Sequence, residues 1–233
     1  MVFGKAEGHS GWLNNQTALD YSYQAVLAAI FFIQNSGFPP HFTPEPLNKP
    51  VDNQNLQVFG TPLALSDNVA AWVTKYIQGM TSRVSAVNSK IPVMLQDGFK
   101  GEPYFSPSFP ASTNLVSDIH NYCFAGRGVS SANETTFICQ DAKSSAGDGR
   151  LPTCIGEWSI QAEIASKFAL RVKTWNTGLY AFNKYTSGSA YWTAKFTGTA
   201  EVDGEGTQAD YWDYSTFISD GLIKPALGAA FCD

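Results

Sequence analysis

The stretch 151-LPTCIGEWS-159 joins a largely apolar run to a single acidic residue, Glu157. Residues 151–155 have the composition of a buried parallel strand, and Gly156 and Trp158 flank the acid that follows them. In a parallel α/β barrel, functional side chains project from the carboxyl ends of the strands. The stretch therefore predicts a barrel strand that carries a functional glutamate at its open end.

Helical patterns alternate with further short strands along the chain. Apolar residues recur at helical spacing in residues 18–34, 67–88, 161–186 and 210–219. Short apolar runs that end in polar or aromatic residues occupy residues 42–47, 91–95, 114–119, 151–155 and 190–196. This alternation predicts an α/β fold with a parallel sheet. The sequence offers about five such strands, whereas a closed TIM barrel has eight. We therefore expect a single domain, residues 1–233, with the fold of an incomplete TIM (β/α) barrel.

The composition excludes several classes of partner. The 233 residues carry a net charge of −5, only 15% of them are charged, and no cluster of lysine or arginine is present. These features argue against binding to nucleic acid or to an anionic membrane. No apolar run is as long as a membrane span. The cysteines lack the close spacing of a zinc site, so we expect no metal and no cofactor.

Four cysteines and two N-glycosylation sequons indicate an oxidising, extracellular setting. Each sequon has the form Asn-x-Thr, and the acceptor residues are Asn15 and Asn133. We therefore expect a secreted protein with glycans at these two positions.

The cysteine positions favour one disulfide. Cys139 lies in a long polar loop expected over residues 125–150, and Cys232 lies in the tail. These segments are able to meet, so we predict that the two residues are bonded. Cys123 and Cys154 lie on or beside adjacent predicted strands, and they either pair or stay reduced.

Glu157 has the surroundings of a catalytic carboxylate. In a retaining glycosidase, such a residue attacks the anomeric carbon of the sugar and forms a covalent glycosyl-enzyme. His120 and Tyr122 are two residues apart at the end of a predicted strand, so both side chains point to one face and suit hydrogen bonds to one carboxylate or one sugar. Trp192, in the last predicted strand, offers an indole on which the apolar face of a sugar can stack.

The expected partner of Glu157 carries the wrong charge. Retaining glycosidases use a second carboxyl group, about 5 Å from the nucleophile, as the acid/base. The matching position lies in residues 47–50 (LNKP), where Asn48 is followed by Lys49. A lysine amine has an unperturbed pKa of about 10.4, so it keeps its proton when the leaving oxygen needs it. We therefore predict that hydrolysis is impaired or lost.

Other acidic residues near predicted strands are poor replacements for the missing acid. Glu45 is four residues before Lys49 on the same predicted strand, roughly 13 Å lower, so it cannot substitute. Asp97 and Glu102 lie near other strand tips and stay open as substitutes.

Together these residues resemble glycoside hydrolase family 5, specifically the fungal exo-β-1,3-glucanases (glucan 1,3-β-glucosidases). The resemblance covers nearly the whole chain and rests on residues 42–53, 118–122, 156–159 and 191–195. It implies an incomplete family barrel in which the chain matches strands four to eight. Members of the family release glucose from the non-reducing end of β-1,3-glucan, with retention and without a metal.

The resemblance also implies a role for each matching residue. Glu157 takes the position of the nucleophile and Lys49 that of the acid/base, while Asn48 precedes the acid/base and contacts the substrate. The residues implied around the nucleophile and the sugar are His120, Tyr122, Phe124 and Trp192.

These features support different functional hypotheses. The leading one is a secreted pseudoenzyme that no longer hydrolyses β-1,3-glucan but retains weak binding to it or to an oligosaccharide. Another is a carbohydrate-binding or signalling protein, such as an effector, with exposed aromatic residues expected near Tyr104, Phe105, Phe124 and Trp192. The alternative is an active glucan 1,3-β-glucosidase whose missing segment or acid is supplied otherwise.

Because an incomplete barrel has two edge strands, we also expect these edges to be covered by the N-terminal segment or by a second copy of the chain.

Overall fold

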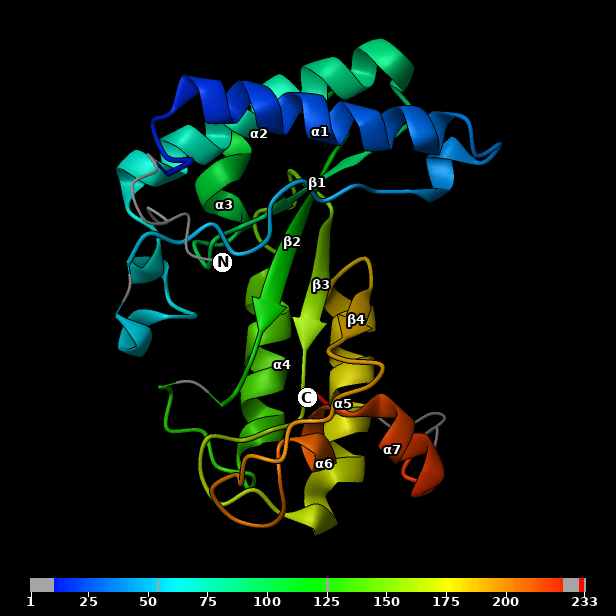
Figure 1. Ribbon diagram of the computed structural model, residues 1–233. Coiled ribbons are helices and arrows are strands. Elements are labelled where there is room, and N and C mark those ends of the chain that lie inside the picture. The colour runs from blue at the N-terminus through cyan, green and yellow to red at the C-terminus, as the bar shows by residue number, and fades with distance from the viewer. Residues whose placement is uncertain (1–10, 54, 125, 224–230, 233) are drawn as a thin grey trace. The chain divides into compact units, whose positions relative to one another are not determined.

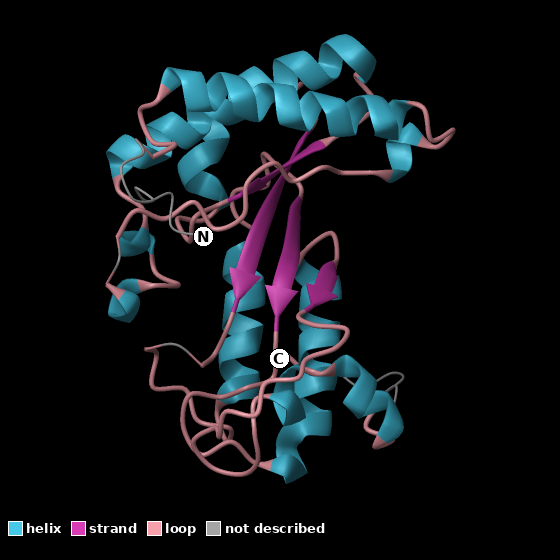
Figure 2. Ribbon diagram, in the orientation of Figure 1, coloured by secondary structure: helices cyan, strands magenta, loops and turns pink. Residues whose placement is uncertain are grey.

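The computed structural model describes residues 11–53, 55–124, 126–223 and 231–232, coloured along the chain in Figure 1. The chain divides into two compact units, unit 1 with residues 1–118 and 148–152 and unit 2 with residues 119–147 and 153–233. Both units contain helices and strands (Figure 2). None of the described helices combines the length and the apolar character that a membrane crossing requires. The single domain expected from the sequence stays a prediction.

Within the described residues, four strands form a sheet in the order β1-β2-β3-β4: β1 is Val93–Gln96, β2 is Leu115–Asn121, β3 is Thr153–Trp158 and β4 is Ser189–Tyr191. β1 pairs with β2 in parallel, with Val93 opposite Leu115. β3 pairs with β4 in parallel, with Ile155 opposite Ser189. The α/β fold with a parallel sheet, as the sequence predicts, is therefore confirmed.

Two of the predicted strands differ from the structure. Residues 42–47 form no regular strand, although the carbonyl of Pro44 accepts a hydrogen bond from the backbone N–H of Met94 in β1 at 2.9 Å. Pro44 and Pro46 have no backbone N–H, so this segment cannot complete a ladder beside β1. The strand predicted over residues 190–196 is shorter than expected, since β4 ends at Tyr191.

Unit 1 contains two long helices that lie side by side, α1 (Gln16–Gln34) and α2 (Asp67–Asn88) (Figure 1). α2 has the bounds predicted from its apolar spacing. α1 begins before the predicted residue 18 because Asn15 is its N-cap, and the Asn15 side chain accepts a hydrogen bond from Ala18 N at 3.1 Å. An asparagine carboxamide satisfies the first free N–H groups of a helix well, which explains the earlier start.

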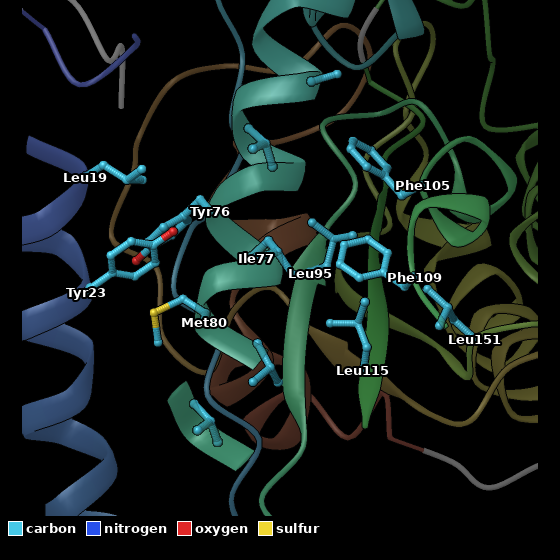
Figure 3. Packing of buried hydrophobic residues seen from close by; sticks show 14 of the residues in the cluster. Leu19, Tyr23, Tyr76, Ile77, Met80, Leu95, Phe105, Phe109, Leu115 and Leu151 are labelled. Atoms are coloured by element: carbon cyan, nitrogen blue, oxygen red, sulfur yellow. The ribbon is translucent and has the colours of Figure 1, made fainter. Parts of the chain in front are cut away.

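The core of unit 1 is formed by residues of these helices, of β1 and of the start of β2. Figure 3 labels residues of this core: Leu19, Tyr23, Tyr76, Ile77, Met80, Leu95, Phe105, Phe109, Leu115 and Leu151. The short helix α3 (Glu102–Phe105) contributes Phe105, which is only 1% exposed. The expectation of an exposed aromatic residue is therefore wrong for Phe105 and holds for its neighbour Tyr104, which is 41% exposed.

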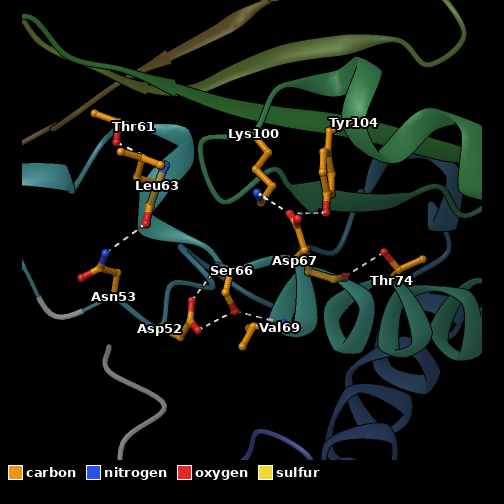
Figure 4. A network of polar contacts seen from close by, with 11 residues as sticks. Asp52, Asn53, Thr61, Leu63, Ser66, Asp67, Val69, Thr74, Lys100 and Tyr104 are labelled. Carbon is orange, nitrogen blue, oxygen red and sulfur yellow. Dashed lines mark hydrogen bonds and ion pairs between the residues drawn. The ribbon is translucent and has the colours of Figure 1, made fainter.

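A polar network holds the N-terminus of α2 (Figure 4). The carboxylate of Asp52 accepts hydrogen bonds from the backbone N–H of Ser66 at 2.8 Å and from its hydroxyl at 2.7 Å. Asp67 accepts hydrogen bonds from Lys100 at 3.0 Å and from Tyr104 at 2.9 Å. Both bonds lower the pKa of the Asp67 carboxyl, and the bond from Lys100 has the larger effect. The negative charge therefore stays at the helix N-terminus, where it is favourable.

Unit 2 contains α4 (Glu134–Ser145), α5 (Arg171–Tyr185), α6 (Ala209–Trp212) and α7 (Tyr214–Ser219). The polar loop predicted over residues 125–150 contains α4, which has few apolar residues and therefore gives a weak helical signal. Of the helix predicted over residues 161–186, only the later part is α5. The helix predicted over residues 210–219 is broken at Asp213, whose side chain caps α7 by accepting a hydrogen bond from Thr216 N at 3.1 Å.

A disulfide joins Cys139 of α4 to Cys232, with their Cα atoms 5.5 Å apart, which confirms the predicted pair. The sequence left open whether Cys123 and Cys154 pair or stay reduced. In the structure both residues carry thiols, so they are reduced. Cys123 is buried, and this burial raises the pKa of its thiol well above the ordinary value. Cys123 is therefore a neutral thiol packed in the core of unit 2.

Gly178 of α5 provides a test of the packing in unit 2. A Cβ atom at this position would lie 2.4 Å from Cζ3 and 2.8 Å from Cη2 of the buried Trp158 ring. Alanine favours a helix over glycine by about 1 kcal/mol, but overpacking a core costs about 1–3 kcal/mol. We expect Gly178→Ala to lower the free energy of unfolding, measured by urea denaturation. In a Trp158→Leu background, where both ring carbons are gone, it should be neutral or stabilising; an equal loss in both backgrounds would contradict this account.

Candidate active site

Glu157 lies near the carboxyl end of β3, as the sequence predicts, and it is only 5% exposed. The next residue, Trp158, packs against Trp175 and Phe182 of α5, with ring centroids 5.2 Å apart in both pairs. Because side chains alternate along a strand, Glu157 points to the opposite face of the sheet. The packing of Trp158 thus fixes the direction of the neighbouring carboxylate.

The structure brings His120 and Tyr122 to the same oxygen of Glu157. The phenol of Tyr122 donates a hydrogen bond to Oε2 of Glu157 at 2.6 Å. Nδ1 of His120 lies 3.5 Å from that oxygen, and the side chains of His120 and Glu157 are 2% and 6% exposed. A hydrogen bond to a carboxylate is strong when it is shielded from water. The spacing of two residues between His120 and Tyr122 therefore does place both side chains on one carboxylate.

An aromatic block surrounds Tyr122. Its ring stacks on Trp212, with centroids 5.7 Å apart and planes at 16°, and contacts Phe124 at 5.0 Å. The indole N–H of Trp212 donates to Oε1 of Gln161 at 2.7 Å, and Phe196 contacts the same indole at 5.4 Å. Sequence reasoning missed Trp212, Gln161 and Phe196. Gln161 lies beyond the end of β3, so the alternation along that strand gives no signal for it.

No protein-family model matches the sequence, and no curated protein matches it either. Two solved structures match with a TM-score of 0.90, AoRut at 52% identity and the rutinosidase from Aspergillus niger at 48% identity. The matches cover 94% and 95% of this chain, and 61% and 62% of those chains. A GH5 family lichenase from Caldicellulosiruptor sp. F32 matches at 16% identity with a TM-score of 0.54, over 81% of this chain and 58% of that chain. The chain has the fold of glycoside hydrolase family 5.

The chain spans about three fifths of the length of AoRut and of the Aspergillus niger rutinosidase, and the expected incomplete TIM barrel is confirmed. Functional side chains of such barrels lie at the carboxyl ends of the strands, which is where β3 presents Glu157. The narrower expectation of an exo-β-1,3-glucanase has no specific support, since the solved structure that matches at 48% identity is named a rutinosidase.

Trp192 and Phe124 differ in how they are presented. Trp192 follows β4 directly and is 42% exposed, so its indole is accessible to a sugar. Its backbone N–H donates to the carbonyl of Trp158 at 2.9 Å, which ties it to β3. Phe124 is partly buried and contacts the Trp212 ring at 5.2 Å. Trp192 is therefore the exposed aromatic surface in this part of unit 2, while Phe124 belongs to the aromatic block.

Asn48 and Lys49 lie in unit 1. They come directly after the irregular segment of residues 42–47, which bonds to β1 through Pro44. Asn48 is exposed and Lys49 is partly buried. The backbone of Lys49 has a φ of +48°, a left-handed conformation that side-chain-bearing residues adopt rarely and at a cost. Position 49 therefore lies outside any regular strand. The acid/base position of Lys49 and the substrate contact of Asn48 stay predictions.

The acids left open as substitutes have structural partners in unit 1. The Asp97 carboxylate accepts hydrogen bonds from the backbone N–H groups of Phe99 at 2.8 Å and Gly101 at 2.9 Å. Glu102 is 1% exposed, and its carboxylate accepts bonds from two backbone N–H groups of the loop before β3, at 2.9 and 3.0 Å. Glu45 is exposed on the irregular segment before Lys49. Asp97 and Glu102 therefore stabilise turns.

The two sequon asparagines both lie at helix starts. The side chain of Asn15 caps α1 and also donates to the carbonyl of Gly11 at 3.1 Å. Asn133 is exposed, and its side-chain oxygen accepts a hydrogen bond from Ser130 N at 2.8 Å. Glycosylation at either residue stays a prediction, and Asn133 is the more exposed of the two.

Proposed function

We propose that the chain is a secreted, rutinosidase-like relative of the retaining family 5 glycosidases in which hydrolysis is lost or strongly impaired. The observation that carries the proposal is the pair of buried contacts to Oε2 of Glu157, made by Tyr122 and His120. Such contacts orient a carboxylate for attack on an anomeric carbon. The second element is the lysine at position 49, where a retaining enzyme needs an acid.

The proposed chemistry separates into two steps with different requirements. In the first, an oxygen of Glu157 forms a bond to the anomeric carbon while the bond from that carbon to the leaving oxygen breaks. An alkoxide is a poor leaving group, so this step needs a proton from a carboxylic acid beside the leaving oxygen. The sequence has a lysine, Lys49, where that acid is needed. An activated aryl group leaves as an aryloxide without that proton. Glu157 should therefore react with activated glycosides only.

The proposed ligand is a glycoside with a sugar that stacks on the exposed Trp192. Similarity to the Aspergillus niger rutinosidase makes rutinosides the first ligands to test, ahead of β-1,3-glucan and its oligosaccharides. The Cys139–Cys232 disulfide supports secretion, because such bonds persist in oxidising compartments. Coverage of the barrel edges by the N-terminal segment or by a second copy of the chain stays a prediction.

The test compares two substrates on the same protein. Incubation with an unactivated rutinoside is expected to release no sugar, and chromatography measures the release. Incubation with an activated 2-deoxy-2-fluoro aryl glycoside is expected to add one sugar to Glu157, seen by intact-protein and peptide mass spectrometry. Glu157→Gln is the control and should give no adduct. Brisk release of sugar from the unactivated rutinoside would overturn the loss of hydrolysis, and the absence of any adduct would overturn the role of Glu157.

A further inference from the structure

Trp212, the last residue of α6, forms the wall on which the Tyr122 ring lies. The two ring planes are at 16° with centroids 5.7 Å apart. Tyr122 lies one residue beyond β2, so the backbone ladder of the sheet does not fix its position directly. Its hydrogen bond to Glu157 at 2.6 Å is nevertheless short, and such a bond weakens steeply when the donor turns away. Something other than the strand must therefore hold the phenol.

Trp212 is itself fixed from several directions. Its indole N–H donates to Oε1 of Gln161 at 2.7 Å, and its carbonyl accepts from Thr193 N at 2.7 Å. Phe196 contacts the indole at 5.4 Å with planes at 36°. An aromatic ring with a satisfied N–H and packed neighbours is a rigid support.

These contacts form a closed circuit that begins and ends on one segment. Glu157 contacts Tyr122, Tyr122 stacks on Trp212, and Trp212 bonds to Gln161. Gln161 is four residues after Glu157 on the chain that continues β3. Glu157 and Gln161 therefore lie on the same short stretch of backbone. Through Trp212, this stretch also fixes the position of Tyr122 relative to β3.

We propose that Trp212 is a positioning residue for the Glu157 carboxylate that acts through Tyr122, with Gln161 setting the plane of the indole. The proposal rests on the proposed role of Glu157 as nucleophile. A stacked aromatic pair contributes about 0.5–1.5 kcal/mol, so its loss should reduce the rate of Glu157 labelling by up to about tenfold. The effect should depend on the phenol of Tyr122, because Trp212 does not act on Glu157 directly.

The test is a double-mutant cycle on the full chain with Trp212→Leu, Tyr122→Phe and both together. The first readout is the second-order rate of labelling by the activated fluoro-glycoside. Trp212→Leu should slow labelling about tenfold in the wild-type background and less than about twofold in the Tyr122→Phe background. Trp212→Phe keeps a ring on Tyr122 and should restore most of the rate. Phe168→Leu removes another stacked ring of unit 2, on Tyr211, and should leave the rate unchanged.

The second readout does not require a reaction at Glu157. In protein labelled with ¹³C-glutamate, the carboxyl resonance assigned through Glu157→Gln should move in Trp212→Leu in the same direction as in Tyr122→Phe, with no further change in the double variant. If wild type is not labelled, the proposed function fails and this resonance alone decides the positioning role. Equal effects of Trp212→Leu in both backgrounds, in either readout, would overturn the proposal. If Trp212→Leu does not fold, as judged by circular dichroism, Gln161→Leu takes its place and should act in the same direction.

Discussion

Replacement of Lys49 by glutamate is expected to raise hydrolysis of an unactivated rutinoside by about 10²–10⁴-fold, the usual contribution of a positioned proton donor. The substitution supplies a carboxylic acid where the wild-type chain has a lysine side chain. It replaces none of the apolar residues that form the unit 1 core. The measurement is the rate of sugar release per protein at saturating substrate, compared with the wild-type chain.

The controls for this gain separate charge from acid chemistry. Lys49→Gln removes the positive charge without adding an acid and should leave hydrolysis of the rutinoside near the wild-type rate. The double variant with Lys49→Glu and Glu157→Gln should lose all of the gain, because the nucleophile is absent. If Lys49→Glu gives no gain while Glu157 still reacts with the activated glycoside, position 49 is not the acid/base and the proposed cause of inactivity is wrong.

The second large effect concerns Glu134, the first residue of α4. It is 1% exposed, and burial raises the pKa of its carboxyl from 4.5 to about 8, while a hydrogen bond with Thr174 opposes the rise. Among the described residues, its Oε1 has no hydrogen-bond partner. A group whose pKa is raised by folding stabilises the fold fully below its unfolded pKa and loses this contribution as the pH rises through the folded pKa. Stability should therefore fall between pH 4.5 and about 8.

Glu134→Gln is expected to remove this slope. At about pH 8 the variant should exceed the wild-type free energy of unfolding by up to about 5 kcal/mol, from 1.36 kcal/mol for each unit of pKa change. Urea denaturation from about pH 5 to about pH 8 measures it. Glu201→Gln, at an exposed glutamate, is the matched control and should keep the wild-type slope. Identical pH dependence of the wild type and of Glu134→Gln would contradict the buried, protonated carboxyl.

The groups near Glu134 do not titrate in this range. Burial raises the pKa of Tyr211 to about 12 and the pKa of Tyr191 well above its ordinary value. Burial also raises the pKa of the Cys123 thiol well above its ordinary value. The difference in slope between the wild type and Glu134→Gln therefore reports the Glu134 carboxyl.

The sequence predicts those parts of the site that follow from the geometry of one strand. The apolar run before Glu157 places the acid at the end of β3, and the spacing of His120 and Tyr122 places both on one carboxylate. The period of two is a property of any strand, so these predictions need no tertiary information. The bounds of α2 follow in the same way from its apolar spacing.

The rest of the site depends on contacts between distant segments. Trp212 reaches Gln161 across 51 residues, and Tyr122 reaches Glu157 across 35. No local pattern marks Trp212 as the support of Tyr122, and the buried state of Glu134 is set by helices and strands that the sequence does not place. The irregular segment at residues 42–47 is different, since Pro44 and Pro46 in the sequence already argue against a regular strand.

The bond between Cys139 and Cys232 also determines how the chain behaves after cleavage. The two residues are 93 positions apart, so any protease cut between them leaves both fragments covalently joined. A nicked protein would migrate as a single band in a denaturing gel until a reductant is added. The loops around β3 and β4 can therefore be cut without release of the C-terminal fragment.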